Sequence, residues 1–324
     1  MTTAKINRIL EKAMPFFIPA SVIVGILLSD YIKGYEYLVP WLFAVMTLVG
    51  SLNSNFISLK HAVTHPLPLV LILVILHIVM PIFAWGVGHI LFPGDIYTIT
   101  GLILGMAIPT GITSFVWVSM YRGNSALVLA IILICTLLSP IIVPATMSFF
   151  VGGNIEIDAV GIMKGLLLMI VLPSVLGMVF NQFSKEKAVK LSKQLAPVSK
   201  IFMGVVVALN GAVVAPYLVD VSWKLIGIGI TVLFIAFLGY VISFLAARWF
   251  KFDQENTVAM IFTGGMRNIS TGVVIATAYF PAPVAIPVVL AMLFQQVLAS
   301  VFGAFIDRFY GKEEVVIGTE KYSG

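Results

Sequence analysis

One arginine lies inside an apolar stretch long enough to cross a membrane, and its chemistry sets the first question. Arg267 follows a glycine pair within the apolar run 258–279, where residues 263–268 read Thr-Gly-Gly-Met-Arg-Asn. A cation at the centre of a bilayer costs about 2.5–3.5 kcal/mol on insertion scales, so such residues are functional by default. The guanidinium group donates hydrogen bonds and accepts none, and its planar, forked set of N–H groups matches the two oxygens of a carboxylate. The motif therefore predicts a polar site within the membrane, with a carboxylate as one candidate ligand.

A second interrupted stretch lies in the first half of the chain. Residues 109–114 read Pro-Thr-Gly-Ile-Thr-Ser inside the apolar run 99–120. Unwound backbone at bilayer depth survives only where it faces protein or a water-filled cavity. Two broken segments at corresponding places in two halves indicate the binding site of a transporter. Thr113 and Ser114 either contact a ligand there or hydrogen-bond backbone groups freed by Pro109, and the sequence leaves both open.

Composition restricts the class of protein. The 324 residues are 60% hydrophobic and 10% charged, against about 25% charged residues in soluble domains. This composition predicts an all-α polytopic membrane protein. The net charge of +5 arises at helix ends, so we expect no nucleic-acid partner. Aspartates and glutamates also fall at helix ends, which argues against an intramembrane enzyme with paired carboxylates.

The apolar runs predict ten membrane-spanning helices. A span needs about 20 apolar residues, and that length places helices at residues 14–32, 36–54, 67–92, 98–121, 124–150, 157–182, 196–219, 223–250, 256–279 and 282–309.

Basic residues predict the orientation, because cytoplasmic loops are enriched in lysine and arginine. With the N-terminus inside, the outer loops hold only Lys33 and Lys224, while Lys164 and Arg267 fall within spans. Both termini are then cytoplasmic. The cytoplasmic side holds the remaining basic residues, Lys5, Arg8, Lys12, Lys60, Arg122, Lys185, Lys187, Lys190, Lys193, Lys200, Arg248, Lys251, Arg308, Lys312 and Lys321.

Ten spans divide into two halves at a basic loop predicted around residues 184–193. Because five is odd, the second half enters the membrane from the opposite side, which makes an inverted repeat. Residues 1–183 then hold spans 1–5 and the start of the second repeat, span 6. Residues 184–311 hold spans 7–10, and residues 312–324 form a polar tail. The two interrupted stretches fall in spans 4 and 9, which are counterparts.

Five further polar residues lie within predicted spans and are candidates for the site. His77 precedes Pro81 and either carries a proton near neutral pH or is a neutral histidine bonded between helices. Of Gln295 and Gln296, helical geometry allows one to face a central cavity. Asn210 is expected to line the substrate cavity, because intramembrane polar groups face inward. Asn268 is expected to bridge the two broken helices, with substrate contact also open.

Several motifs resemble the bile acid:sodium symporter family, in order over about residues 15–308. They are Ser51-Leu52…Phe56…Leu59-Lys60…Pro66, Pro109-x-Gly111-x-x-Ser114, Arg122-Gly123-Asn124-x-Ala126-Leu127, Thr136-Leu137-Leu138-Ser139-Pro140, Met163-Lys164 followed by Leu172-Pro173-x-x-Leu176-Gly177, and Gly265-Met266-x-Asn268.

The resemblance implies a fold and a function. It implies a panel domain, residues about 14–54 and 157–219, and a core domain, residues about 67–150 and 223–309, in which spans 4 and 9 cross. It implies secondary transport of an organic anion, a bile acid or a small carboxylate of the pantoate type, with sodium by an elevator-like motion. A bacterial-type fold places the chain in the cytoplasmic (inner) membrane, with lipid and the substrate as its partners.

The chain departs from the family at the sodium-binding positions. Where the family has oxygen ligands, this chain has Phe115, Val128 and Ile132, and the shared glutamate and the glutamine are replaced by Thr263 and Arg267. A family His-Asn pair appears as Gln295-Gln296. The degraded sodium-site positions are thus Ser114, Phe115, Val128, Ile132, Thr263, Met266 and Arg267.

These departures suggest that Arg267 supplies the positive charge that sodium supplies in relatives, because three apolar side chains and a guanidinium offer no acceptor. Gly264 and Thr263 then belong to the same crossing. On this hypothesis transport needs no sodium and no cofactor. The alternatives are sodium-coupled symport, a channel, and a structural Arg267 held by carbonyls at the end of a half-helix.

Overall fold

The computed structural model describes residues 13, 16–17, 19–53, 66–153, 155–218 and 222–320, and helices account for most of them. The elements are α2 (Ser29–Ile32), η1 (Lys33–Leu38), α3 (Val39–Ser51), α5 (Pro66–Val74), η2 (Ile75–Val79), α6 (Met80–Leu91), α7 (Ile96–Ala107), α8 (Ile112–Met120), α9 (Ser125–Val151), α10 (Ala159–Leu166), η3 (Leu167–Val171), α11 (Leu172–Phe183), α12 (Lys185–Leu218), α13 (Trp223–Trp249), α14 (Gln254–Gly265), α15 (Ile269–Tyr279), η4 (Ala282–Val284) and α16 (Ala285–Glu320).

Most of the expected spans are present as long apolar helices. Within the described residues, seven helical stretches are long and apolar enough to cross a membrane, and the bent pair α7–α8 makes up to eight. The expected spans at 14–32 and 36–54 correspond to a helix over residues 19–27, α2 and α3. The start of the first lies outside the described residues. The all-helical membrane class is confirmed, while ten spans and an inverted repeat stay predictions.

Two boundaries differ from those expected from hydropathy. The basic segment 184–193 is not a loop, because α12 begins at Lys185 rather than at residue 196. Its lysines, glutamate, alanine and leucine are good helix formers, although the segment as a whole is too polar to enter the bilayer. Likewise α16 runs to Glu320, so residues 312–320 of the predicted tail continue the last helix. Residues 321–324 lie outside the described part.

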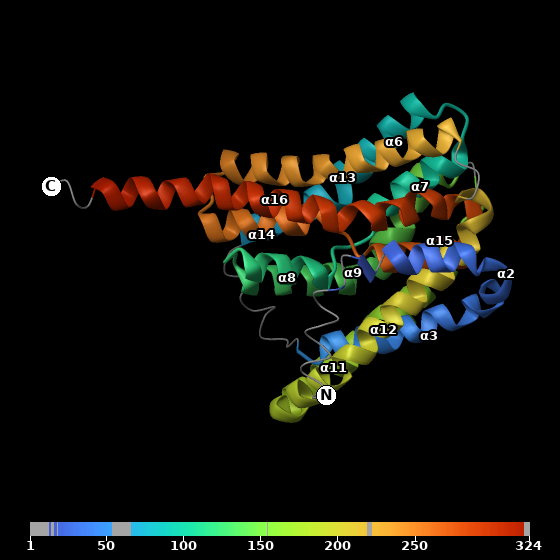
Figure 1. Ribbon diagram of the computed structural model, residues 1–324, viewed down its shortest axis with the longest axis horizontal. Coiled ribbons are helices and arrows are strands. Elements are labelled where there is room, and N and C mark those ends of the chain that lie inside the picture. Colours follow the sequence, from blue (N-terminus) through green and yellow to red (C-terminus); the bar gives the residue numbers. More distant parts are fainter. Residues whose placement is uncertain are drawn as a thin grey trace.

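The helices pack in two groups (Figure 1). In one, α12 packs against α3 and α11; in the other, α13 packs against α14 and α16, and α7 against α6, α9 and α16. We call these groups the panel and the core; that they move as units stays a prediction. They meet where α10 contacts α9 and where α12 contacts α15. Toward the left-hand end of Figure 1, where α14 begins, they diverge.

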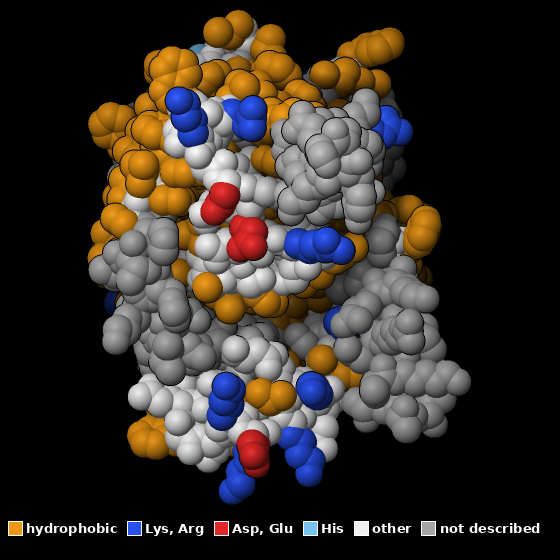
Figure 2. All heavy atoms as spheres, turned by 90° about the vertical axis from the view of Figure 1, so that its left-hand side faces the viewer, with side chains coloured by type: hydrophobic (Ala, Val, Ile, Leu, Met, Phe, Trp, Pro, Cys, Tyr) orange, Lys and Arg blue, Asp and Glu red, His pale blue; other side chains and the backbone are white. Residues whose placement is uncertain are grey.

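Basic side chains gather at that left-hand end, which faces the viewer in Figure 2. Lysines and arginines lie on both groups, and hydrophobic side chains cover the flanks. Arg122 follows α8, Arg248 lies in the last turn of α13, Lys251 follows that helix, and Lys185 begins α12, all of them exposed. The positive-inside rule predicts that this end faces the cytoplasm, and the orientation stays a prediction.

The Arg122-Gly123-Asn124 motif turns the chain between α8 and α9. Arg122 has a left-handed backbone (φ 55°), and the Gly123 amide donates to the Val118 carbonyl at 2.8 Å, which closes α8 with a Schellman-type bond. The Asn124 side chain then caps α9 by accepting from the Leu127 amide at 3.0 Å, and its amide group donates to Asn256 of α14 at 2.9 Å. The motif therefore fixes the position of α14 relative to α8.

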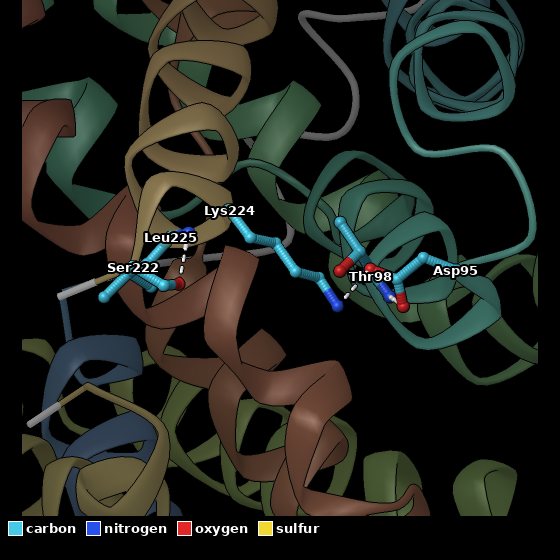
Figure 3. Close-up of polar contacts among 5 residues, drawn as sticks. All are labelled: Asp95, Thr98, Ser222, Lys224 and Leu225. Carbon is cyan, nitrogen blue, oxygen red and sulfur yellow. Dashed lines mark hydrogen bonds and ion pairs between the residues drawn. The ribbon is translucent and has the colours of Figure 1, made fainter. Parts of the chain in front are cut away.

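An ion pair joins the amino-terminal ends of α7 and α13 (Figure 3). Asp95 caps α7 through the Thr98 amide, and its other oxygen pairs with Lys224 Nζ at 2.8 Å. Ser222 caps α13 by accepting from the Leu225 amide at 3.1 Å. Burial raises the pKa of the Asp95 carboxyl, but hydrogen bonds from Lys224 and Thr98 outweigh it, and the pKa lies below its ordinary value.

We expect this ion pair to stabilise the core above about pH 4, the ordinary value for Asp, and to lose that effect as the pH falls through the lower folded-state pKa. Lys224→Met is expected to cost roughly 0.2–1 kcal/mol, and Asp95→Ala about 1 kcal/mol more because the cap is also lost. Thermal unfolding in detergent at pH 7 measures both. The control is Lys33→Met, which removes an exposed pair with Asp30 at 3.6 Å; equal losses for Lys33→Met and Asp95→Ala would contradict the assignment.

Candidate functional site

Both expected interruptions are present, and they meet. The backbone leaves the helix between Ala107 and Ile112, with a bend of 56°, and again between Gly265 and Ile269. The Asn268 amide donates to the Pro109 carbonyl at 2.8 Å, so one break is hydrogen-bonded to the other. The first is shorter than the 109–114 stretch suggested, because α8 already begins at Ile112.

The crossing packs closely because glycines line it. A Cβ added at Gly111 would lie 3.1 Å from the Asn268 Cβ, and one added at Gly239 of α13 would lie 2.9 Å from the Gly264 carbonyl oxygen. At Gly265 an added Cβ would overlap the ring of Tyr240. The glycine pair therefore permits the close contact of α14 with α13, beyond weakening the helix.

The guanidinium of Arg267 lies between the carboxyl ends of two half-helices. Its Nε donates to the Met106 carbonyl of α7 at 3.3 Å, and its Nη1 donates to the carbonyls of Gly264 at 2.8 Å and Met266 at 3.3 Å. The residue is 3% exposed. A helix carboxyl end carries roughly half a negative charge, so one guanidinium approximately balances two such ends.

Part of the guanidinium has no hydrogen-bond partner among the residues that the structure describes. Nη2 of Arg267 is buried and makes no hydrogen bond within the described residues. No carboxylate among those residues forms an ion pair with it. The backbone carbonyls thus compensate the positive charge, as expected of a structural arginine. The two N–H donors of Nη2 remain without an acceptor among the described residues.

The amino ends of the other two half-helices lack side-chain caps. Neither Gly111 at the start of α8 nor Asn268 at the start of α15 makes a side-chain cap hydrogen bond. Uncapped amino ends offer backbone N–H donors and a positive partial charge, which suit an anion. The crossing therefore presents both a carbonyl-rich side, occupied by Arg267, and amide-rich ends.

The hydroxyl candidates are mostly committed to local backbone. Ser114 is fully buried and its hydroxyl donates to the Gly111 carbonyl at 2.7 Å, while Thr263 donates to the Ala259 carbonyl at 2.7 Å. Thr113 is half-buried. Of the degraded sodium positions, Val128 is fully buried, and Phe115 and Ile132 are half-buried. Ser114 and Thr263 therefore hold the backbone around the break.

The two glutamines of α16 take different roles. Gln295 Oε1 accepts from the Arg267 backbone amide at 2.9 Å, so it belongs to the crossing. Gln296 accepts from Trp117 Nε1 at 3.1 Å and joins α16 to α8. Asn210 of α12 is 1% exposed and its Nδ2 lacks a partner within the described residues. His77 lies in η2, and neither of its ring nitrogens has a hydrogen-bond partner within the described residues.

Sequence reasoning missed three contributors. Thr110 donates to Ser114 Oγ at 3.3 Å, Tyr240 packs on Gly265 with an unpartnered hydroxyl, and the Thr271 hydroxyl is likewise unpartnered within the described residues. The sequence could have pointed to Tyr240 and Thr271, because each is a polar residue within an apolar predicted span. Thr110 stood inside the 109–114 stretch without being singled out.

Comparison with known proteins agrees with these observations. Residues 21–310 match the model of the SBF-like CPA transporter family. The chain belongs to this family. The expected resemblance is confirmed, and the protein is a multi-pass membrane transporter rather than an enzyme.

Three relatives show the range of similarity. The chain is 52% identical over 297 residues to the uncharacterized protein YbaS of Bacillus subtilis, covering 91% of this chain and 97% of YbaS. It is 25% identical over 256 residues to the uncharacterized sodium-dependent transporter YocS of the same species, covering 79% and 78%. It is also 25% identical over 317 residues to the probable chloroplastic sodium/metabolite cotransporter BASS1 of Arabidopsis thaliana, covering 95% and 76%.

We expect Gly265→Ala to destabilise the crossing, because the added methyl group overlaps Tyr240 and overpacking costs about 1–3 kcal/mol. Tyr240→Leu in the same chain should recover part of that loss. The matched control is Gly105→Ala in α7, where an added Cβ meets nothing within 4 Å. Thermal unfolding compares the variants; a Gly265→Ala protein as stable as Gly105→Ala would contradict the packing described here.

Proposed function

We propose that this protein is a secondary transporter for an organic carboxylate in which Arg267 replaces a coupling cation. The observation that carries the proposal is the guanidinium between the carbonyls of Met106 and Gly264. In transporters with broken helices, carbonyls at half-helix carboxyl ends typically coordinate sodium. Here a covalently attached cation holds that place, and it cannot leave during the cycle.

The side chains around the crossing support a site without sodium. Sodium requires several oxygen ligands, and Phe115, Val128 and Ile132 supply none from their side chains. Thr263 directs its hydroxyl hydrogen to Ala259. A second cation beside Arg267 would also be repelled, since the charges interact strongly at low dielectric.

The substrate class follows from the remaining donors. Nη2 of Arg267 is unpartnered within the described residues, and the starts of α8 and α15 lack side-chain caps. Both features suit a carboxylate. A bile acid or a smaller carboxylate of the pantoate type satisfies this chemistry, and the body of the substrate would lie between core and panel near Asn210. Alternating access then carries it across the bacterial inner membrane, with both termini in the cytoplasm.

Sodium-coupled symport is the second candidate. It is favoured by two relatives, one named a sodium-dependent transporter and the other a probable sodium/metabolite cotransporter. It requires that oxygen ligands come from backbone carbonyls that Arg267 does not occupy.

Binding of pantoate and of taurocholate to the purified protein, in sodium and in potassium chloride, separates these candidates. We expect equal affinity in both salts for wild type. Arg267→Gln should lose about 1.5–3 kcal/mol, the worth of a charge-assisted hydrogen bond, or roughly ten- to 150-fold in affinity. Arg248→Gln is the control, because that exposed arginine lies over Phe309, 5.4 Å from the ring centre.

Affinity that rises steeply with sodium in wild type would overturn the proposal in favour of symport. Saturable uptake with counterflow in proteoliposomes is expected as well, and its absence would indicate a channel.

A further inference from the structure

His77 is a half-buried titratable residue that the proposed anion site does not use. It lies in η2, a five-residue π-helix between α5 and α6. Both ring nitrogens are buried and lack a hydrogen-bond partner within the described residues. Buried polar atoms are nearly always paired, and π-helical turns are frequent at functional sites. The ring nitrogens are therefore open to a proton, although burial in an apolar interior disfavours the charged form of the ring.

Among the described residues, Arg267 is the charged group that acts on His77. The elements packed on η2 are its neighbours α5 and α6, and across the core α7 and α13. From these, Tyr240 of α13 adds a buried hydroxyl that is also unpartnered within the described residues. Arg267 lies close enough to interact electrostatically with both His77 and Tyr240. The other charged groups of α7, α13 and α14 lie at the helix ends, outside the apolar interior.

We propose that His77 is a proton-binding site linked to the anion site, so that one proton crosses the membrane with each organic anion. The proposal rests on the proposed function, because it requires an anion at Arg267. Nη2 of Arg267 has no acceptor among the described residues, and a carboxylate bound there would neutralise the charge that adds to the effect of burial in opposing protonation of His77.

The linkage follows from electrostatics. In the empty protein, burial in an apolar interior disfavours a protonated His77, and Arg267 adds to this because the imidazolium would be a second cation in a medium of low dielectric. An incoming carboxylate cancels the arginine charge, and the imidazole then accepts a proton. By linkage, the proton increases anion affinity by the same factor that the anion increases proton affinity.

The charge balance suits a carrier. The empty site holds the guanidinium alone, and the loaded site holds the guanidinium, one carboxylate and one imidazolium. The net charge is therefore unchanged by loading, and the cargo of one anion and one proton is neutral. Moving an uncompensated charge through a membrane potential would be costly, at about 2.3 kcal/mol per 100 mV.

Titration calorimetry of the full-length protein in sodium-free solution tests this inference, with pantoate as the probe. Measurement in two buffers of different ionisation enthalpy gives the protons taken up per anion bound. We expect uptake approaching one proton for wild type, and affinity that falls by up to tenfold per pH unit above neutrality. His77→Gln should take up none and should bind with less than twofold change between pH 6 and 8.

His89→Gln is the matched control. His89 lies on the same span, is exposed, and contacts the Trp85 carbonyl through Nδ1 at 2.9 Å, so its replacement should leave proton uptake as in wild type. Sodium-free binding without proton uptake, or equal uptake by His77→Gln, would overturn the proton site and leave the proposed function standing. Failure of wild type to bind without sodium would overturn the proposed function and the proton linkage together.

Discussion

The contact of one guanidinium with the carboxyl ends of two interrupted helices is the interaction on which the core depends. The Arg267 side chain donates to carbonyls that end α7 and α14. Each end carries about half a negative charge, and two such ends would repel each other inside an apolar core. A single fixed positive charge approximately cancels both. The hydrogen bond between Asn268 and Pro109 then holds the two breaks together.

The crossing also explains where ligand chemistry is concentrated. Each interruption divides a helix into two half-helices. The carboxyl ends of α7 and α14 and the amino ends of α8 and α15 therefore lie at the crossing. The carboxyl ends are occupied by the guanidinium, whereas α8 and α15 begin without side-chain caps. Asn210 of α12 and Thr271 of α15 are buried polar residues on two helices, of panel and core, that contact each other. Separation of panel from core, which the proposed alternating access requires, would expose them.

Sequence alone predicted the parts that hydropathy and composition control. The helical membrane class, the boundaries of the long spans and the two breaks follow from apolar length and from Pro109, Gly111 and the glycine pair. It failed at Lys185, where a helix continues in polar sequence and hydropathy gives no signal. It also left open whether Ser114 and Arg267 bind ligand or backbone, because that depends on carbonyls such as that of Met106, which are distant in sequence. The packing of Tyr240 on Gly265 is equally a property of tertiary contact.

The most direct test of the central claim is the effect of sodium on thermal stability. Any ion that binds only the folded protein raises the apparent Tm. We predict the same Tm for wild type in sodium chloride and potassium chloride at equal ionic strength. The double variant Thr263→Glu/Arg267→Gln, which exchanges the fixed cation for a carboxylate and an amide, should instead gain stability with sodium. A wild-type protein that sodium stabilises over potassium would show that a mobile cation occupies the crossing, and would contradict the account.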